Sequence, residues 1–230
     1  MRKLVDLSTS VERKYYAMLN KRCEHRHTIE SHPGCFNKQF YELEGQKVGY
    51  LDIEATDLNA NSAWMLSWAV KTRGFNAGFD NIVYNDIFIR PGKVNRAFDK
   101  RITAELLEVM AEHTVLVTYY GTGFDLPFIR TRAMMLDLKF PKVKTIAHID
   151  LYYHVRGKMS LNKNSLAMAT KALDISGKTH LDFAYWKLAG MGDEETMQKL
   201  IKHNVEDVKI LESLHKKLEP LITFKRSAYV

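Results

Sequence analysis

Two acidic residues, Asp52 and Glu54, stand at a spacing that could serve metal chemistry. They lie in residues 47–54, where alternating side chains predict a β-strand. Side chains two apart on a strand project from one face, so the two carboxylates repel each other unless a cation or a proton lies between them. The strand is otherwise apolar, which predicts a central position in a sheet. Alternatively, Asp52 ends the strand at its rim and Glu54 is solvated. Asp-x-Glu is too short a motif to exclude this alternative by itself.

A third acid, Asp125, follows a predicted buried strand at 114–119 and a double-glycine turn at 121–123. Connections of ordinary handedness would bring it to the end of the sheet that holds Asp52. Alternatively, it caps the helix that Pro127 opens, and one residue can do both.

His203 and Asp207 lie four residues apart on a predicted long helix, and so share one face. Apolar residues such as Leu200 and Leu211 lie on the same side, which predicts that Asp207 is directed toward the sheet. The alternative is a solvated pair on the helix surface, which would contribute little to stability.

Together, the four carboxylates of Asp52, Glu54, Asp125 and Asp207 predict a two-metal site at one sheet edge. Hard oxygen ligands suit Mg²⁺ or Mn²⁺ rather than zinc. Two such ions about 4 Å apart can activate a water and stabilise the leaving oxygen of a phosphodiester. His203 is the candidate general base, because imidazole accepts a proton near neutral pH.

The elements that must position these residues form an α/β pattern. Three strands are predicted at 47–54, 64–71 and 82–90 as a meander, and two more at 114–119 and 145–149. Helices are predicted from Asp99 or Thr103 to Glu112, at 128–136, at 165–173, and from an Asp193 cap to Leu218, with a short one at 11–20. This order predicts a mixed central sheet flanked by helices.

Three segments in this order resemble motifs of the DEDD 3′–5′ exonucleases of the ribonuclease-H-like superfamily. They are LDIEAT at 51–56, YYGTGFDLPF at 119–128 and HNVEDV at 203–208. The bacterial and phage branch, which looks like the proofreading domain of family-B DNA polymerases, is the most similar. Residues 149–151, Ser165-Leu166 and Lys178 follow the spacing of that branch.

The resemblance spans about residues 46–222. It implies a ribonuclease-H-like fold and an exonuclease activity that releases nucleotides from a 3′ end. It implies that Asp52, Glu54, Asp125 and Asp207 hold two Mg²⁺ or Mn²⁺ ions. One position departs from the family. The branch commonly has Tyr four residues before the last Asp and another large branch has His five before it, whereas here His203 stands at the tyrosine spacing. The resemblance therefore leaves the identity of the base open.

The chain divides into a basic extension at 1–44, an exonuclease domain at 45–222 and a tail at 223–230. The extension holds both cysteines of the chain. A structural zinc knuckle is predicted there, with Cys23, His25, His32 and Cys35 as ligands and His27 as the alternate. Alternatively, the segment is a loop whose histidines contact phosphate or solvent.

The net charge of +7 is concentrated in two segments. Residues 139–178 hold eight Lys or Arg against two acidic residues, a net +6, and residues 1–38 hold eight against four, a net +4. Such segments could hold a nucleic-acid backbone, and Tyr119 and Tyr120 could stack on bases. The candidate contacts are Phe124, Lys142, Lys144, Lys158 and Lys163. A solvated face for the lysines and a core position for Phe124 are the alternatives.

The remaining features narrow the function. The length of 230 residues suits one domain, and two cysteines cannot form a disulfide framework. We expect no membrane span and no signal peptide. The protein is therefore expected to be located in the cytoplasm of a bacterial or phage-infected cell. The predicted function is a 3′–5′ exonuclease on DNA or RNA, with a preference for single-stranded 3′ ends. An endonuclease or structure-selective nuclease on the same fold and a non-catalytic nucleic-acid-binding protein are the alternatives. The sequence does not predict the oligomeric state.

Overall fold

A five-stranded mixed sheet forms the centre of the molecule. The computed structural model describes residues 21–23, 25–28, 31, 47–74, 80–86, 97–141, 146–177, 181–222 and 230. The strand order is β3-β2-β1-β4-β5. The strands are β1 (Lys47–Ala55), β2 (Met65–Gly74), β3 (Asp80–Asp86), β4 (Val115–Thr118) and β5 (Ala147–Asp150).

The pairing of the strands confirms the predicted topology. β1, β2 and β3 are antiparallel neighbours, as a meander requires, while β1, β4 and β5 run parallel. β1 is therefore the central strand and pairs on both edges. Residues 48–51 and 53–55 of this strand are buried, and Asp52 between them is half-buried.

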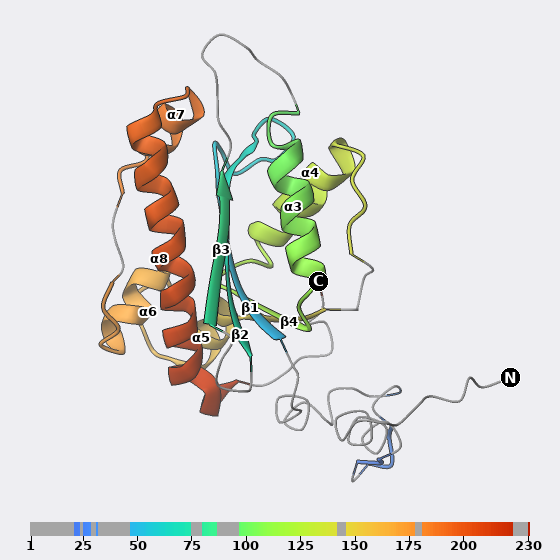
Figure 1. Cartoon of the computed structure of the whole chain (residues 1–230). Helices are drawn as coiled ribbons and strands as arrows, with labels where there is room; N and C mark the ends of the chain where they lie inside the picture. Colours follow the sequence, from blue (N-terminus) through green and yellow to red (C-terminus); the bar gives the residue numbers. More distant parts are fainter. Residues whose placement is uncertain are drawn as a thin grey trace, which may run out of the picture.

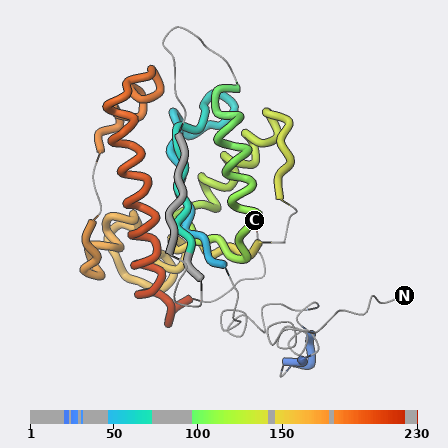
Figure 2. Tube along the Cα trace, viewed as in Figure 1, coloured from blue at the N-terminus to red at the C-terminus, as the bar shows by residue number. Residues whose placement is uncertain are grey.

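Helices cover both faces of the sheet (Figure 1). On one side lie α5 (Leu151–Lys158), α6 (Leu166–Ala172), α7 (Ala184–Gly190) and α8 (Glu194–Leu218). On the other side lie α3 (Lys100–Ala111) and α4 (Asp125–Met135). Figure 2 shows α8 running beside the sheet along most of its height, and a 3₁₀ turn at Glu219–Leu221 ends it. Among the described helices, none is both long and apolar enough to span a bilayer.

The side chains of β1 alternate between the two faces of the sheet. Val48 and Tyr50 belong to an apolar cluster with Leu211 of α8. Leu51 belongs to a second cluster, which contains Ile129 of α4. Because side chains two apart share a face, the carboxylates of β1 are on the face covered by α8.

The helix starts differ from the expectation at two places. Asp99 occupies the cap position of α3 without a side-chain capping hydrogen bond, because its carboxylate binds Arg132 instead. α4 begins at Asp125, three residues earlier than predicted, and Phe124 holds its cap position. The interpretation of Asp125 as a cap is therefore wrong.

The long helix follows its prediction closely. The Asp193 side chain accepts a hydrogen bond from the backbone N–H of Thr196 at 2.8 Å, and the helix ends at Leu218. Helices α5 and α7 were not predicted, since each spans two turns and carries no clear apolar period. The predicted helix at 11–20 and residues 87–90 of the predicted third strand lie outside the described residues.

Candidate active site

Strand β1 carries the first two carboxylates. Asp52 pairs with Ala69 of β2 and Glu54 pairs with Ser67, after which the register shifts and the strand ends. The side chain of Asp52 is half-buried and that of Glu54 is 7% exposed. Burial of this kind requires that each carboxylate be held by hydrogen bonds or by a cation.

Asp125 meets this strand from the first turn of α4. The backbone N–H of Ile53, between the two acids of β1, donates to Oδ1 of Asp125 at 3.3 Å. The predicted placement of Asp125 at the same end of the sheet as Asp52 is confirmed. Burial, with a smaller contribution from the nearby Asp150, raises the pKa of Asp125 to about 7 against the opposing effect of the hydrogen bond from Ile53.

The turn before Asp125 requires glycine at one position. A Cβ at Gly121 would lie 2.2 Å from Oγ1 of Thr118, far inside contact distance. The carboxylate of Asp150 holds the turn by accepting from the backbone N–H groups of Tyr120 at 2.7 Å and Thr122 at 2.9 Å. It also caps α5 by accepting from the backbone N–H of Tyr152.

Helix α8 supplies the remaining residues. His203 and Asp207 are both buried, with Nε2 of His203 at 3.9 Å from Oδ2 of Asp207. The expectation that Asp207 faces inward is confirmed. Between them, Asn204 donates from Nδ2 to Oδ2 of Asp52 at 2.6 Å, and its own Oδ1 accepts from Ser67 at 3.3 Å.

A tryptophan on α7 joins the two halves of this group. Nε1 of Trp186 donates to Oε2 of Glu54 at 2.5 Å. The same indole lies edge-on to the ring of His203, with 6.0 Å between the ring centroids. Contacts from β1, α4, α7 and α8 thus connect all five predicted catalytic residues into one group.

Sequence reasoning missed Asn204, Ser67 and Trp186. Asn204 stands inside the HNVEDV motif, so its position beside His203 was a usable signal. Ser67 and Trp186 carry no such signal, because their contacts depend on pairing with β1 and on the packing of α7. These three residues position the carboxylates.

The donor set fits hard divalent cations. Its acidic members offer carboxylate oxygens from three separate elements, which are the ligands that Mg²⁺ and Mn²⁺ take.

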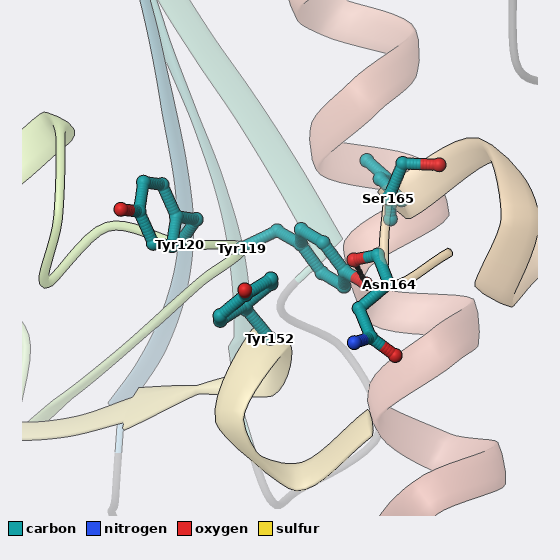
Figure 3. Close-up of a pocket in the computed structure, with 6 residues that line it drawn as sticks. Tyr119, Tyr120, Tyr152, Asn164 and Ser165 are labelled. Carbon is teal, nitrogen blue, oxygen red and sulfur yellow. Dashed lines mark hydrogen bonds between the residues drawn. The ribbon is translucent and has the colours of Figure 1, made fainter. Parts of the chain in front are cut away.

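A pocket of about 450 Å³ opens beside the Asp150 turn (Figure 3). Its lining residues are Tyr119, Tyr120, Tyr152, Asn164, Ser165 and Leu166. The Tyr119 hydroxyl donates to the Asn164 carbonyl at 2.6 Å, and burial raises the pKa of that hydroxyl. The rings of Tyr120 and Tyr152 meet edge to face with 4.8 Å between their centroids, and Tyr120 is 46% exposed.

The candidate nucleic-acid contacts are dispersed. Phe124 is half-buried and its ring lies 5.6 Å from that of Phe128, so it belongs to the edge of the core. Lys158 and Lys163 are exposed, the first at the end of α5 and the second next to the pocket residue Asn164. Lys142 and Lys144 lie outside the described residues, as does Lys178.

The predicted zinc ligands are described in part. The structure brings Cys23, His25 and His27 together, whereas His32 and Cys35 lie outside the described residues. His27, the alternate ligand, is therefore a member of the described cluster.

Comparison with known proteins assigns the fold to a family. The model of the RNase_H superfamily matches residues 49–219, which is more than half of the chain and includes every carboxylate of the group. The chain belongs to the RNase_H superfamily. The predicted ribonuclease-H-like fold is thereby confirmed.

Several DNA polymerases resemble part of the chain. DNA polymerase 1 of Sulfolobus acidocaldarius is 33% identical over 152 residues, which are 56% of this chain and 16% of that protein. A DNA polymerase of Thermococcus litoralis is 27% identical over 129 residues, 46% of this chain and 8% of that protein. The match thus covers less than a fifth of each of these relatives.

A solved structure supports the fold. The family B DNA polymerase of Pyrobaculum calidifontis superposes with a TM-score of 0.60 at 19% identity, over 76% of this chain and 25% of that chain. The relatives named here are archaeal, so placement of this chain in the bacterial and phage branch stays a prediction.

Proposed function

We propose that this protein is a metal-dependent 3′–5′ exonuclease that hydrolyses phosphodiester bonds at single-stranded 3′ ends of DNA or RNA. Membership of the RNase_H superfamily and similarity to DNA polymerases support nuclease activity. The observation that carries the proposal is the hydrogen bond from Ile53 to Asp125, which places a carboxylate of α4 against the central strand between Asp52 and Glu54.

Asp52, Glu54, Asp125 and Asp207 would hold two Mg²⁺ or Mn²⁺ ions. Such ions, when bound, supply a nucleophile at neutral pH and stabilise charge on the leaving oxygen. The donors on this chain keep the carboxylates oriented: the amide of Asn204 holds Asp52 and the indole of Trp186 holds Glu54.

His203 is the proposed general base. Its ring is fixed by the edge-on contact with Trp186, and Asp207 one turn later stabilises the imidazolium that forms when the ring accepts a proton. The 3.9 Å separation suits charge stabilisation rather than a direct hydrogen bond. Trp186 therefore links the proposed base to the carboxylate of Glu54.

The tyrosine pocket is the proposed site for a base of the substrate strand. Its aromatic rings offer stacking surfaces that tolerate any base, and exposed Lys163 next to the pocket can meet a phosphate. The pocket lies on the turn that leads into Asp125, so a strand stacked there passes close to the carboxylates. Phe124, at the edge of the core on the same turn, is the proposed contact for the neighbouring nucleotide, and the exposed Lys158 is the proposed contact for the backbone.

A direct test uses 5′-labelled single strands of DNA and RNA, each with a free or a chemically blocked 3′ end, and a circular single strand. Each substrate is incubated with Mg²⁺, with Mn²⁺ or with EDTA. We expect stepwise shortening only of strands with a free 3′ end, and only with metal. Cleavage of the circle would instead identify an endonuclease, and binding without cleavage a non-catalytic protein.

Asp52→Asn provides the variant and Asp57→Asn its control. Asp57 is an exposed acid five residues further along the chain, so its loss removes the same charge outside the carboxylate group. We expect Asp52→Asn to lower the rate by about 10³-fold, which corresponds to about 4 kcal/mol of transition-state stabilisation. Equal rates for the two variants would refute the assignment of the site.

A further inference from the structure

A tight turn in the N-terminal extension brings three potential metal ligands together. The backbone N–H of Arg26 donates to the Cys23 carbonyl at 2.8 Å, and the N–H of Cys23 donates to the His27 carbonyl at 3.0 Å. Arg26 takes a left-handed conformation with φ of 62°, which reverses the chain. Residues 23 and 27 are thus held next to each other at the base of the turn.

The side chains on this turn offer soft and borderline donors. Sγ of Cys23 and one ring nitrogen each of His25 and His27 lie within 4.8 Å of one another. The centroids of the two imidazole rings are 6.0 Å apart, the rings are tilted by 36°, and both histidines are exposed.

We propose that Cys23, His25 and His27 bind a zinc ion. Tetrahedral zinc with sulfur at about 2.3 Å and nitrogen at about 2.0–2.1 Å separates its ligand atoms by about 3.4–3.6 Å. The donor atoms therefore need to approach by at most about 1.4 Å, a displacement of the size that side-chain rotation supplies without moving the backbone of the turn. A thiolate with two imidazoles selects zinc over Mg²⁺ or Mn²⁺, which prefer oxygen.

The proposed zinc site is separate from the carboxylate group in sequence and in chemistry. Its role would be structural, because the ion crosslinks a short turn that two backbone hydrogen bonds alone would hold weakly. The turn presents Arg22, whose guanidinium donates to the Arg26 carbonyl at 3.1 Å. Zinc would therefore fix a basic surface, whether or not the protein is a nuclease.

The first experiment measures zinc by mass spectrometry in the full chain after purification and gel filtration. The double variant Asp52→Asn/Asp207→Asn serves as the background, so that zinc held by the carboxylates does not contribute. We expect about one zinc per chain. Adding Cys23→Ser or His27→Ala to the background should lower the content at least tenfold, whereas the control His154→Ala, a histidine of α5, should keep it.

Cobalt substitution provides an independent measurement. Tetrahedral Co²⁺ bound to a thiolate gives intense visible bands and a near-ultraviolet charge-transfer band, and both should disappear in Cys23→Ser. Adding His32→Ala and Cys35→Ser singly identifies a fourth protein ligand by the change in the same spectrum. Absence of zinc from the background protein, or full zinc content in both Cys23→Ser and His27→Ala, would overturn the proposal.

Discussion

Two buried aspartates, Asp99 and Asp125, begin two neighbouring helices on the same face of the sheet, yet their surroundings differ. Asp99 is fully buried and takes a two-pronged ion pair from Arg132, with distances of 2.8 Å to Oδ2 and 2.5 Å to Oδ1. The N–H of Met65 donates to the same carboxylate at 2.9 Å. Asp125, only 4% exposed, takes a backbone N–H from Ile53 and its pKa is raised to about 7.

The difference separates a structural acid from a candidate catalytic acid. The chain itself supplies the counter-charge for Asp99, and that pair joins α3 to α4. The donors to the active-site carboxylates described above are neutral: a backbone amide for Asp125, Asn204 for Asp52 and Trp186 for Glu54. Neutral donors such as these orient a carboxylate without cancelling its charge.

Asp125→Asn tests the catalytic half of the comparison. The amide keeps an acceptor for the N–H of Ile53 but loses the charge, so we expect the cleavage rate to fall by about 10³-fold while the fold persists. The unfolding free energy without metal should be unchanged or slightly higher, since a buried charge is removed. Initial rates and urea denaturation measure the two effects.

Thermal shift with and without Mg²⁺ is the accompanying readout. Wild-type protein should gain melting temperature with Mg²⁺, because a ligand that binds the folded state stabilises it, and Asp125→Asn should gain less. A rate within about tenfold of wild type, together with an undiminished Mg²⁺ shift, would place Asp125 outside the metal site.

Asp99→Asn tests the structural half. It leaves the Arg132 guanidinium, 3% exposed, without its charged partner, and we expect a loss of about 3–5 kcal/mol in the free energy of unfolding. Urea denaturation measures the loss. Adding Arg132→Met should recover part of it, and the rate per folded molecule should stay near wild type in both variants. A loss of rate without a loss of stability would contradict the comparison.

The sequence predicted the carboxylates because their spacing depends on local periodicity. Two residues along a strand or four along a helix share a face in any fold, so Asp52 with Glu54 and His203 with Asp207 could be paired without coordinates. The central position of β1 followed from its apolar run. The observed strand order, which the order of elements had predicted, then places the pair on β1 next to the pair on α8.

Position at a helix start did not by itself distinguish Asp99 from Asp125; only the motif at 119–128 did so. Both precede a predicted helix, and a helix start suits an aspartate cap, so capping was the local interpretation for each. What decides their roles is a partner far along the chain: Arg132 for Asp99, which is 33 residues away, and Ile53 for Asp125, which is 72 residues away. Trp186 escaped prediction for the same reason, since 132 residues separate it from Glu54.

A pH titration tests whether the buried histidines His148 and His113 are neutral in the folded protein. Burial lowers the pKa of His148 to about 4, which the nearby Asp150 partly opposes, and the pKa of His113 is lowered by burial as well. Since an unfolded histidine titrates near 6.5, the unfolded chain binds more protons between pH 6.5 and 4. Stability is therefore full above about 6.5 and falls as pH decreases, with about 2 kcal/mol lost to His148 at pH 5.

The test compares urea midpoints at pH 7 and pH 5. His148→Gln can keep a hydrogen bond to Oγ1 of Thr118, which lies 2.8 Å from Nε2 of the native ring, but it cannot titrate. We expect a smaller loss of stability at pH 5 in this variant than in wild type, and an equal loss in the two proteins would contradict the assignment to His148. Asp125 acts with the opposite sign, because its raised pKa favours the folded state as pH falls from 7.

Trp186→Phe tests the smallest effect, the contribution of a neutral donor. Phenylalanine keeps an aromatic ring against His203 but removes the N–H that holds Glu54, so we expect about a tenfold lower cleavage rate, or about 1.4 kcal/mol. Trp64→Phe is the matched control, because that indole packs against Phe98 and its N–H makes no hydrogen bond within the described part of the chain. Higher Mg²⁺ should recover part of the lost rate if the indole acts by orienting Glu54 for the cation. If Trp186→Phe and Trp64→Phe cleave at equal rates, Glu54 needs no neutral donor for catalysis. The contrast between neutral donors and the charged partner of Asp99 would then depend on Asp52 and Asp125 alone.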